Sequence, residues 1–207
     1  MTGLVKAGMP NSSEIAFSME RMNAIIDVDF ETATMTVEAG VTLQEAQEAA
    51  DAHDLMLPLD LGARGSATIG GNLSTNAGGT RVIKYGMMRA LTLGLEVVLA
   101  DGTVISNLNS LLKDNAGYDL KHLFIGSEGT LGIITKAALK LFPKPKSQNV
   151  AFCGLDNFNQ LKELLLKCKV ELGNDLSAFE VLWKPTYEFI IKSTDIHGPL
   201  PKNYKYY

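Results

Sequence analysis

LGARGSATIGGNLSTNAGG, residues 61–79, is the stretch that says most about the fold and the ligand of this chain. Its glycine pairs allow backbone N–H groups to approach a ligand closely and to point at an anion. Ser66, Thr75 and Asn76 add side-chain donors between the glycines. The segment is therefore suited to a pyrophosphate or to another ligand that carries phosphate.

Two common phosphate motifs do not fit this segment. No Gly-Lys-Ser/Thr follows it, so it is not a P-loop, and no Gly-x-Gly-x-x-Gly opens a helix after a strand. Leu57, Leu59 and Ile69 are interleaved with the glycines, which favours a shaped loop over residues 54–90 rather than disorder. From the residues alone, a dinucleotide site and a glycine-rich structural loop both remain open.

Composition sets limits on the class of protein. The 207 residues are 46% hydrophobic and 20% charged, which is ordinary for a globular domain. A net charge of -4 argues against nucleic acid as a partner, because no basic excess is present to neutralise phosphates. No apolar run reaches the roughly 18 residues of a membrane span. Cys153 and Cys168 have neither redox-motif nor zinc-site spacing, and we expect buried free thiols.

Hydrophobic periodicity and turn signals predict a mixture of strands and helices. Thr42 and Glu45 have capping-box spacing at the start of one helix, and Asp101-Gly102 predicts a hairpin turn. Pro143 and Pro145 mark the best domain boundary. The expected helices are 43–53, 119–124 and 158–172, and the expected strands are 15–19, 24–28, 32–37, 91–100, 103–105, 132–141, 149–154 and 177–182.

Several motifs in fixed order carry a family resemblance. Pro58-Leu-Asp-Leu-Gly62, Ile69-Gly-Gly-Asn72 and Thr75-Asn-Ala-Gly-Gly79 resemble the FAD-binding segment of the family that contains vanillyl-alcohol oxidase and p-cresol methylhydroxylase (PCMH). LGLEVVLADG (93–102), KDNAGYDL (113–120) and LFIGSEGTLGIIT (123–135) extend the similarity. Within the family, the chain most resembles the branch of D-2-hydroxyglutarate and D-lactate dehydrogenases.

The resemblance implies an α+β fold in two parts. Residues 1–145 would form an FAD-binding PCMH-type domain, represented by its second subdomain with a mixed or antiparallel sheet and helices, and lacking the N-terminal subdomain. Residues 146–207 would begin a C-terminal α+β substrate domain and stop partway through it. We therefore expect a fragment of a longer enzyme.

The resemblance also implies which residues hold the cofactor. Those in the glycine-rich stretch would surround the flavin ring, the ribityl chain and the phosphates, and those near residue 130 would line the nucleotide through backbone atoms. The implied FAD-binding residues are Thr2, Gly3, Leu4, Pro58, Gly62, Ser66, Ile69, Gly70, Gly71, Asn72, Thr75, Asn76, Gly78, Gly79, Tyr85, Gly86, Glu128, Gly129, Gly132 and Ile134.

The implied activity is oxidation of a D-2-hydroxy acid, above all D-2-hydroxyglutarate to 2-oxoglutarate, by hydride transfer to FAD. A D-lactate or glycolate dehydrogenase and an inert flavin-binding fragment are the alternatives. The family's His-x-Gly-Asp-Gly-Asn-x-His motif, which would hold a zinc-like divalent metal in a full-length member, does not occur here, so no catalytic or metal residue is assigned. His53, His122 and His197 lack metal-pair spacing and are expected to be structural or solvent-facing.

The expected partners are a small 2-hydroxy acid and an electron acceptor, such as an electron-transfer flavoprotein or a quinone, with neither nucleic acid nor a membrane span. Resemblance to eukaryotic members implies a mitochondrial location in a eukaryote and a cytoplasmic one otherwise. The residues that would bind the metal and act as the catalytic base do not occur in this sequence, so the isolated chain is expected to be inactive.

Overall fold

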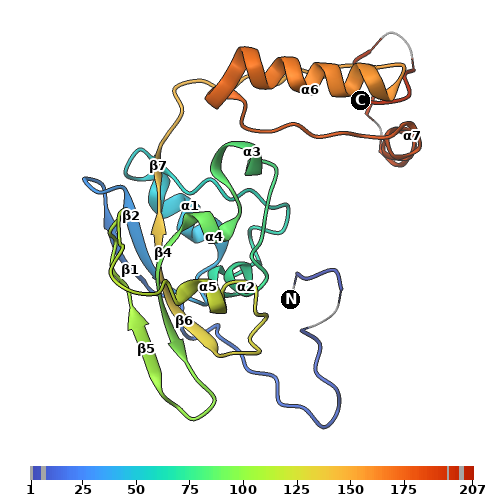
Figure 1. Cartoon of the computed structure of the whole chain (residues 1–207). Helices are drawn as coiled ribbons and strands as arrows, with labels where there is room; N and C mark the ends of the chain where they lie inside the picture. The colour runs from blue at the N-terminus through green and yellow to red at the C-terminus, as the bar shows by residue number, and fades with distance from the viewer. Residues whose placement is uncertain (1, 6–7, 195, 201–202) are drawn as a thin grey trace. The chain divides into compact units, whose positions relative to one another are not determined.

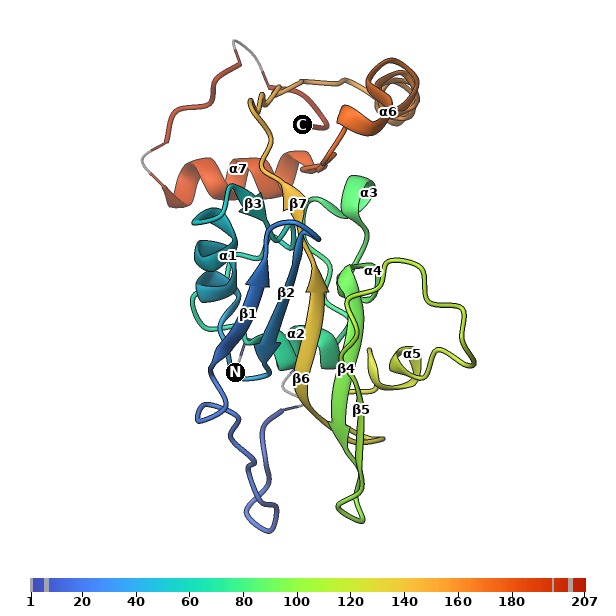
Figure 2. The ribbon, with the colours of Figure 1, turned by 90° about the vertical axis from the view of Figure 1, so that its left-hand side faces the viewer.

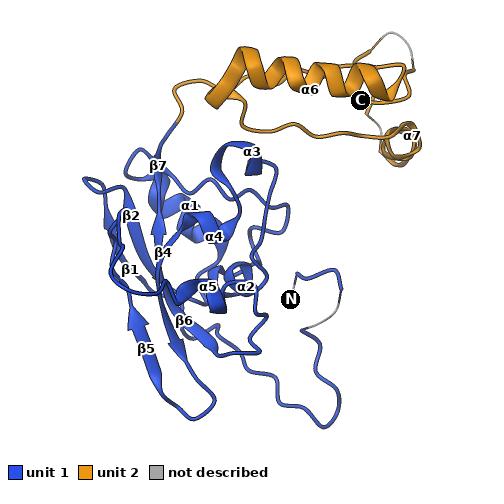
Figure 3. Cartoon of the chain, viewed as in Figure 1, with its two compact units in different colours: residues 1–144 blue, residues 145–207 orange. Residues whose placement is uncertain are grey.

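The chain divides into two compact units, Met1–Lys144 and Pro145–Tyr207 (Figure 3). The structure is a computed structural model that describes residues 2–5, 8–194, 196–200 and 203–207. Each unit has its own internal packing.

Unit 1 is built on an antiparallel sheet of five strands. Their order across the sheet is β1-β2-β6-β4-β5, and every neighbouring pair is antiparallel (Figure 2). A second, two-stranded sheet pairs β3 (Leu55–Met56) with β7 (Phe142–Pro143). The five strands are β1 (Ile25–Asp29), β2 (Thr34–Glu38), β4 (Thr92–Val98), β5 (Val104–Asn107) and β6 (Ile133–Lys140). The expected α+β fold with an antiparallel sheet is confirmed.

Five short helices lie on one face of this sheet (Figure 1). They are α1 (Leu43–Asp51), α2 (Ile69–Ser74), α3 (Val82–Tyr85), α4 (Met88–Leu91) and α5 (Lys121–Phe124). The core forms where the apolar sides of helices and strands meet. Its fully buried members include Met35, Val37, Leu43, Ile69, Leu73, Met88, Leu91, Ala137 and Leu139.

Helix α1 begins with the capping box that the sequence predicts. The Thr42 hydroxyl accepts a hydrogen bond from the Glu45 N–H at 3.2 Å, and a Glu45 carboxylate oxygen accepts one from the Thr42 N–H at 2.9 Å. The hydrogen bonds from the backbone and hydroxyl of Thr42 hold the pKa of Glu45 below its ordinary value. The helix therefore starts at a fixed residue and buries Leu43, Ala46 and Ala50.

The stretch 54–90 contains regular structure where the sequence predicts a loop. It holds β3 and the helices α2, α3 and α4. The N–H groups of Ile69 and Gly70 donate to the carbonyls of Val41 and Ala39, both at 2.8 Å, and thereby fix the start of α2. These partners lie about thirty residues away in the sequence, so local periodicity could not predict the helix.

Unit 2 contains two helices and extended segments. Helix α6 (Phe158–Leu172) matches its predicted bounds, and Asn157 caps it by accepting a hydrogen bond from the Gln160 N–H at 3.0 Å. A 3-10 turn (Gly173–Asp175) follows, and α7 (Lys184–Ser193), which the sequence did not predict, begins with a proline in its first turn.

The strand predictions for 15–19, 149–154 and 177–182 are wrong. These segments are extended or irregular, and in unit 2 only isolated bridges join Leu155 and Trp183 to Tyr206. An apolar run becomes a strand only where another strand pairs with it. The expectation of two buried thiols is also wrong, because Cys153 is exposed and Cys168 is only half-buried. In the described part of the chain, no helix is long and apolar enough to cross a membrane.

We expect Glu45→Gln to lower the free energy of unfolding by about 0.3–1 kcal/mol at neutral pH, because glutamine still offers an acceptor to the Thr42 N–H but lacks the negative charge that is favourable at a helix N-terminus. The folded pKa of Glu45 is depressed. Its contribution is therefore present above the ordinary carboxyl pKa and is lost as pH falls through the folded pKa. Urea unfolding of both proteins between pH 7 and pH 3 measures the difference.

Glu48→Gln is the matched control, since Glu48 is exposed on the same helix and lies outside the capping box. A stability difference for Glu45→Gln that stays constant down to pH 3 would contradict the assignment of this effect to the ionised carboxylate.

Candidate functional site

The two glycine-rich segments meet at the C-terminal end of α2. The Gly126 N–H donates to the Leu73 carbonyl and the Glu128 N–H to the Ser74 carbonyl, both at 2.9 Å. These carbonyls belong to the last turn of the helix, where carbonyls are available to groups outside the helix. The Leu73 carbonyl also accepts a hydrogen bond from the Asn76 N–H at 3.0 Å. The structure thus brings the expected cofactor residues of the 69–79 stretch beside those of the turn 126–129.

This junction contains two non-glycine residues with left-handed backbone. Asn76 has φ +46° and Glu128 has φ +52°. Such a conformation is uncommon outside glycine, tends to occur at functional sites, and persists where surrounding contacts enforce it. The hydrogen bond from Glu128 to Ser74 is one such contact. The main chain on both sides of the junction is therefore held in a defined shape.

Arg89 of α4 joins the same region, and the sequence analysis missed it. Its backbone N–H donates to the Asn76 side-chain oxygen at 2.9 Å, and its guanidinium donates to the His122 carbonyl at 2.6 Å. A second guanidinium nitrogen donates to the Ile125 carbonyl. No local pattern signals this role, because the acceptors are 33 and 36 residues away.

The glycines of the stretch differ in the space that surrounds them. A Cβ at Gly79 would lie 2.0 Å from the Asp60 carbonyl oxygen, and one at Gly70 would lie 2.7 Å from the Ala39 Cβ. Close packing of the chain against itself therefore requires these two glycines. A Cβ at Gly62 would meet no atom of the described residues within 4 Å, which leaves that backbone open to a ligand.

The first turn of α2 does not present free donors to an anion. Ile69 and Gly70 donate to Val41 and Ala39, and the Gly71 N–H donates to the Thr68 hydroxyl at 3.3 Å. The Asn72 N–H donates to the Thr68 carbonyl at 2.9 Å. The expectation that this glycine pair points its N–H groups at phosphate is therefore wrong for Gly70 and Gly71.

The remaining expected residues differ in how accessible they are. Of the seventeen expected residues from Pro58 to Ile134, seven are exposed, five are half-buried and five are buried. The exposed residues are Gly62, Ser66, Gly71, Thr75, Gly78, Glu128 and Gly129, and the buried ones are Pro58, Ile69, Gly70, Asn72 and Ile134.

Asn72 contains a buried side-chain donor without a partner. The residue is only 4% exposed, and its Nδ2 has no hydrogen-bond partner within the described residues. Leaving a buried donor unsatisfied costs about 1–3 kcal/mol, and native proteins contain few such groups. Asn72 lies in the middle of α2, between the exposed Gly71 and the turn-binding carbonyls of Leu73 and Ser74.

The other expected residues have varied surroundings. Thr2, Gly3 and Leu4 lie in an exposed segment, and Leu4 is 98% exposed. The half-buried Tyr85 ring packs edge-on against Phe142, with 4.8 Å between centroids. Ile134 is a core residue paired with Val97 in the sheet.

Two ionisable side chains near the stretch have carboxylate partners within the protein. Arg81 lies 3.4 Å from a carboxylate oxygen of Asp60, so its charge is already balanced. His122 lies 3.2 Å from Asp119. Within the residues that the structure describes, no group of three or more His, Cys, Asp or Glu side chains could hold a metal ion.

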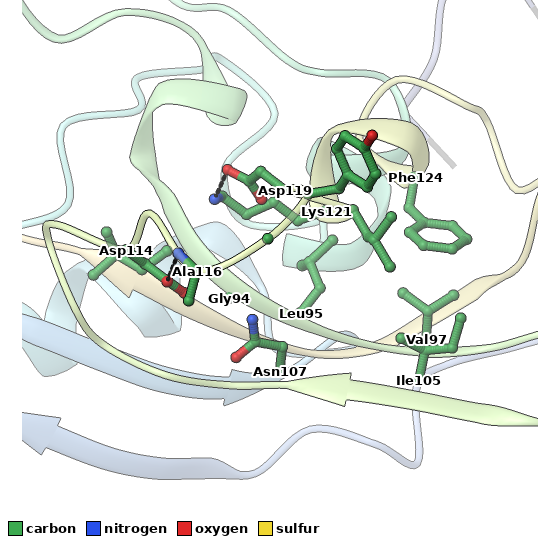
Figure 4. Close-up of a pocket in the computed structure, with 14 residues that line it drawn as sticks. Gly94, Leu95, Val97, Ile105, Asn107, Asp114, Ala116, Asp119, Lys121 and Phe124 are labelled. Atoms are coloured by element: carbon green, nitrogen blue, oxygen red, sulfur yellow. Dashed lines mark hydrogen bonds and ion pairs between the residues drawn. The ribbon is translucent and has the colours of Figure 1, made fainter.

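A small cavity lies elsewhere, between the helix-bearing face of β4 and β5 and the loop 114–121 (Figure 4). Its volume is about 100 Å³, and its lining includes Leu95, Asn107 and Phe124. Ligand pockets usually measure about 300–1,000 Å³. The cavity is therefore too small for a dinucleotide, and none of the expected FAD-binding residues lines it.

Comparison with known proteins identifies the family. Residues 2–107 match the model of the FAD binding domain family. The chain is 47% identical to a protein named probable D-2-hydroxyglutarate dehydrogenase, mitochondrial, from Oryza sativa subsp. indica, over 100% of this chain and 37% of that protein. It is 47% identical to D-2-hydroxyglutarate dehydrogenase, mitochondrial, from Danio rerio, over 96% of this chain and 37% of that protein. The chain thus spans little more than a third of these curated relatives.

Among solved structures, a crystal structure of alkyldihydroxyacetonephosphate synthase matches with a TM-score of 0.54 and 30% identity, over 62% of this chain and 23% of that one. The chain belongs to the FAD binding domain family. Its residues fit that cofactor, because an orphaned donor on Asn72 and an open backbone at Gly62 lie in the stretch expected to hold it.

We expect Gly79→Ala to destabilise the protein by about 3 kcal/mol, because the new methyl group would overlap the backbone of Asp60. Gly62→Ala should change the free energy of unfolding by less than about 0.5 kcal/mol, since its Cβ enters open space. Urea denaturation compares the two. Equal stability of both variants would contradict the conclusion that Gly79 is required for close packing and that Gly62 is not.

Proposed function

We propose that this chain provides most of the FAD site of a flavin-dependent D-2-hydroxy-acid dehydrogenase. In that site, FAD supplies the hydride acceptor. The exposed residues of the 62–78 stretch would contact the flavin and the phosphates, and the turn 126–129 would line the nucleotide through its backbone. The family match over residues 2–107 and the junction of the two glycine-rich segments support this assignment.

The observation that carries the proposal is the unpartnered Nδ2 of Asn72. A buried donor held without a partner lowers stability, so its presence needs an explanation outside the described residues. An acceptor atom of FAD would satisfy it. The same donor would orient the cofactor relative to α2, because the helix is fixed at its start by Val41 and Ala39.

Asn72→Leu tests this role. The change removes the donor at nearly constant volume, so FAD affinity should fall about tenfold, as expected for the loss of one buried hydrogen bond. The free energy of unfolding without FAD should be at least that of the wild type, because an unsatisfied donor is gone. Flavin fluorescence titration and urea unfolding measure the two quantities.

Asn159→Leu on the exposed side of α6 is the matched control for the change in side chain. A purely structural Asn72 would give the opposite pattern, with lower stability in the absence of FAD and unchanged affinity. That result would contradict the proposed role.

We propose D-2-hydroxyglutarate as the substrate of the whole protein, with 2-oxoglutarate as the product. The names of the two relatives at 47% identity support this choice. We further propose that residues 1–145 form the FAD-binding domain and that residues 146–207 begin the substrate domain. The family match falls inside the first of these ranges.

The 207-residue chain loaded with FAD should give no turnover with D-2-hydroxyglutarate and a dye acceptor, because the expected base and divalent metal are not encoded in it. The product of the complete reading frame that contains this chain should oxidise D-2-hydroxyglutarate faster than D-lactate or glycolate. Steady-state assays measure both. Turnover by the 207-residue chain, or preference for D-lactate, would contradict the respective proposal.

The electron acceptor we propose is an electron-transfer flavoprotein or a quinone, since a reduced flavin must be reoxidised before the next turnover. We also propose a mitochondrial location in a eukaryotic cell. The names of the two relatives, which both include the word mitochondrial, support this proposal.

A further inference from the structure

We propose that Arg89 is a positioning residue for the FAD site, because it holds the turn 126–129 against α2. This inference rests on the proposed FAD-binding function. Arg89 is not among the residues expected to touch the cofactor, and its hydrogen bonds go to Asn76, His122 and Ile125.

The guanidinium of Arg89 bridges two carbonyls at the end of α5. One nitrogen donates to the His122 carbonyl at 2.6 Å, and another donates to the Ile125 carbonyl. Carbonyls in the last turn of a helix lack intrahelical partners, and a cation is favourable there. A planar guanidinium can satisfy both acceptors at once, so it fixes the residue that leads into the turn.

The backbone of Arg89 binds the other side of the junction. Its N–H donates to the side chain of Asn76 at 2.9 Å, and the neighbouring Met88 N–H donates to the Ala77 carbonyl at 2.9 Å. The backbone of Arg89 therefore contacts the segment that follows α2. The side chain of Arg89 contacts the segment that precedes the turn 126–129.

The fit around Gly126 shows how closely these parts approach. A Cβ at Gly126 would lie 3.4 Å from a guanidinium nitrogen of Arg89 and 3.4 Å from the Asn76 Cβ. Gly126 then donates to Leu73, and the left-handed Glu128 donates to Ser74. Without the guanidinium, Ile125 would lose the contact that fixes it at the start of the turn 126–129. The turn would become more mobile, and FAD would have to order it on binding. Affinity falls when binding must order the protein.

The experiment compares Arg89→Met and Arg89→Lys with the wild-type 207-residue chain. Arg21→Met, a change of the same kind at an exposed arginine, is the control. One measurement is amide hydrogen exchange of Gly126 and Glu128 without FAD, and the other is the FAD dissociation constant. Circular dichroism and thermal unfolding establish that each variant is folded.

For Arg89→Met we expect exchange at Gly126 and Glu128 to accelerate about tenfold or more and FAD affinity to fall about tenfold, on the scale of one or two lost hydrogen bonds. Arg89→Lys should give intermediate values, because an ammonium group can satisfy only one of the two carbonyls well. If Arg89→Met does not fold, Arg89→Lys decides the question with the same two measurements.

The outcomes separate this inference from the proposed function. If the wild type binds FAD and the folded variants bind it equally well, or if Arg89→Lys equals the wild type in both measurements, the positioning role is overturned. If the affinity for FAD falls but amide hydrogen exchange at Gly126 and Glu128 does not become faster, the role is also overturned. If the wild type itself binds no FAD, the proposed function is contradicted, and the inference is lost with it.

Discussion

Two backbone hydrogen bonds, from Gly126 to Leu73 and from Glu128 to Ser74, join the two glycine-rich segments of this chain. They use carbonyls of the last turn of α2, and they bring together residues that are more than fifty positions apart in the sequence. Several features of the candidate site gather at this junction. They are the left-handed backbone at Glu128, the hydrogen bond from Arg89 to the Ile125 carbonyl, and Gly126, which lies close to Arg89 and Asn76.

The glycines serve this arrangement in more than one way. Gly70 and Gly79 allow main-chain segments of the protein to pack against each other, since a Cβ at either position would overlap a neighbour. Gly62 leaves its backbone accessible instead. A glycine-rich stretch can thus combine close backbone packing, which holds α2 in place, with an exposed backbone segment at Gly62. Asn72 combines both properties, because it is buried in α2 and yet its side-chain donor has no partner among the residues that the structure describes.

Sequence reasoning predicted the elements whose signals are local. The capping box of α1, the bounds of α6 and the strand that became β6 depend on residues within a few positions of one another. It failed where the signal lies elsewhere in the chain. Helix α2 begins where Val41 and Ala39 accept its first N–H groups, and the apolar runs at 149–154 and 177–182 have no strands paired along them. The glycine motifs located the candidate site, whereas Arg89 could not be predicted because its acceptors are distant in sequence.

The central claim is that α2 and the turn 126–129 together form the bed on which FAD lies, with Asn72 as a direct donor. A crystal structure of the protein with FAD bound tests this most directly. The account predicts that Nδ2 of Asn72 lies within about 3.2 Å of an acceptor atom of FAD and that the backbone of the turn borders the cofactor. Binding of FAD at another place, such as the side of the sheet under the loop 114–121, or an Asn72 that still lacks a partner beside bound FAD, would contradict it.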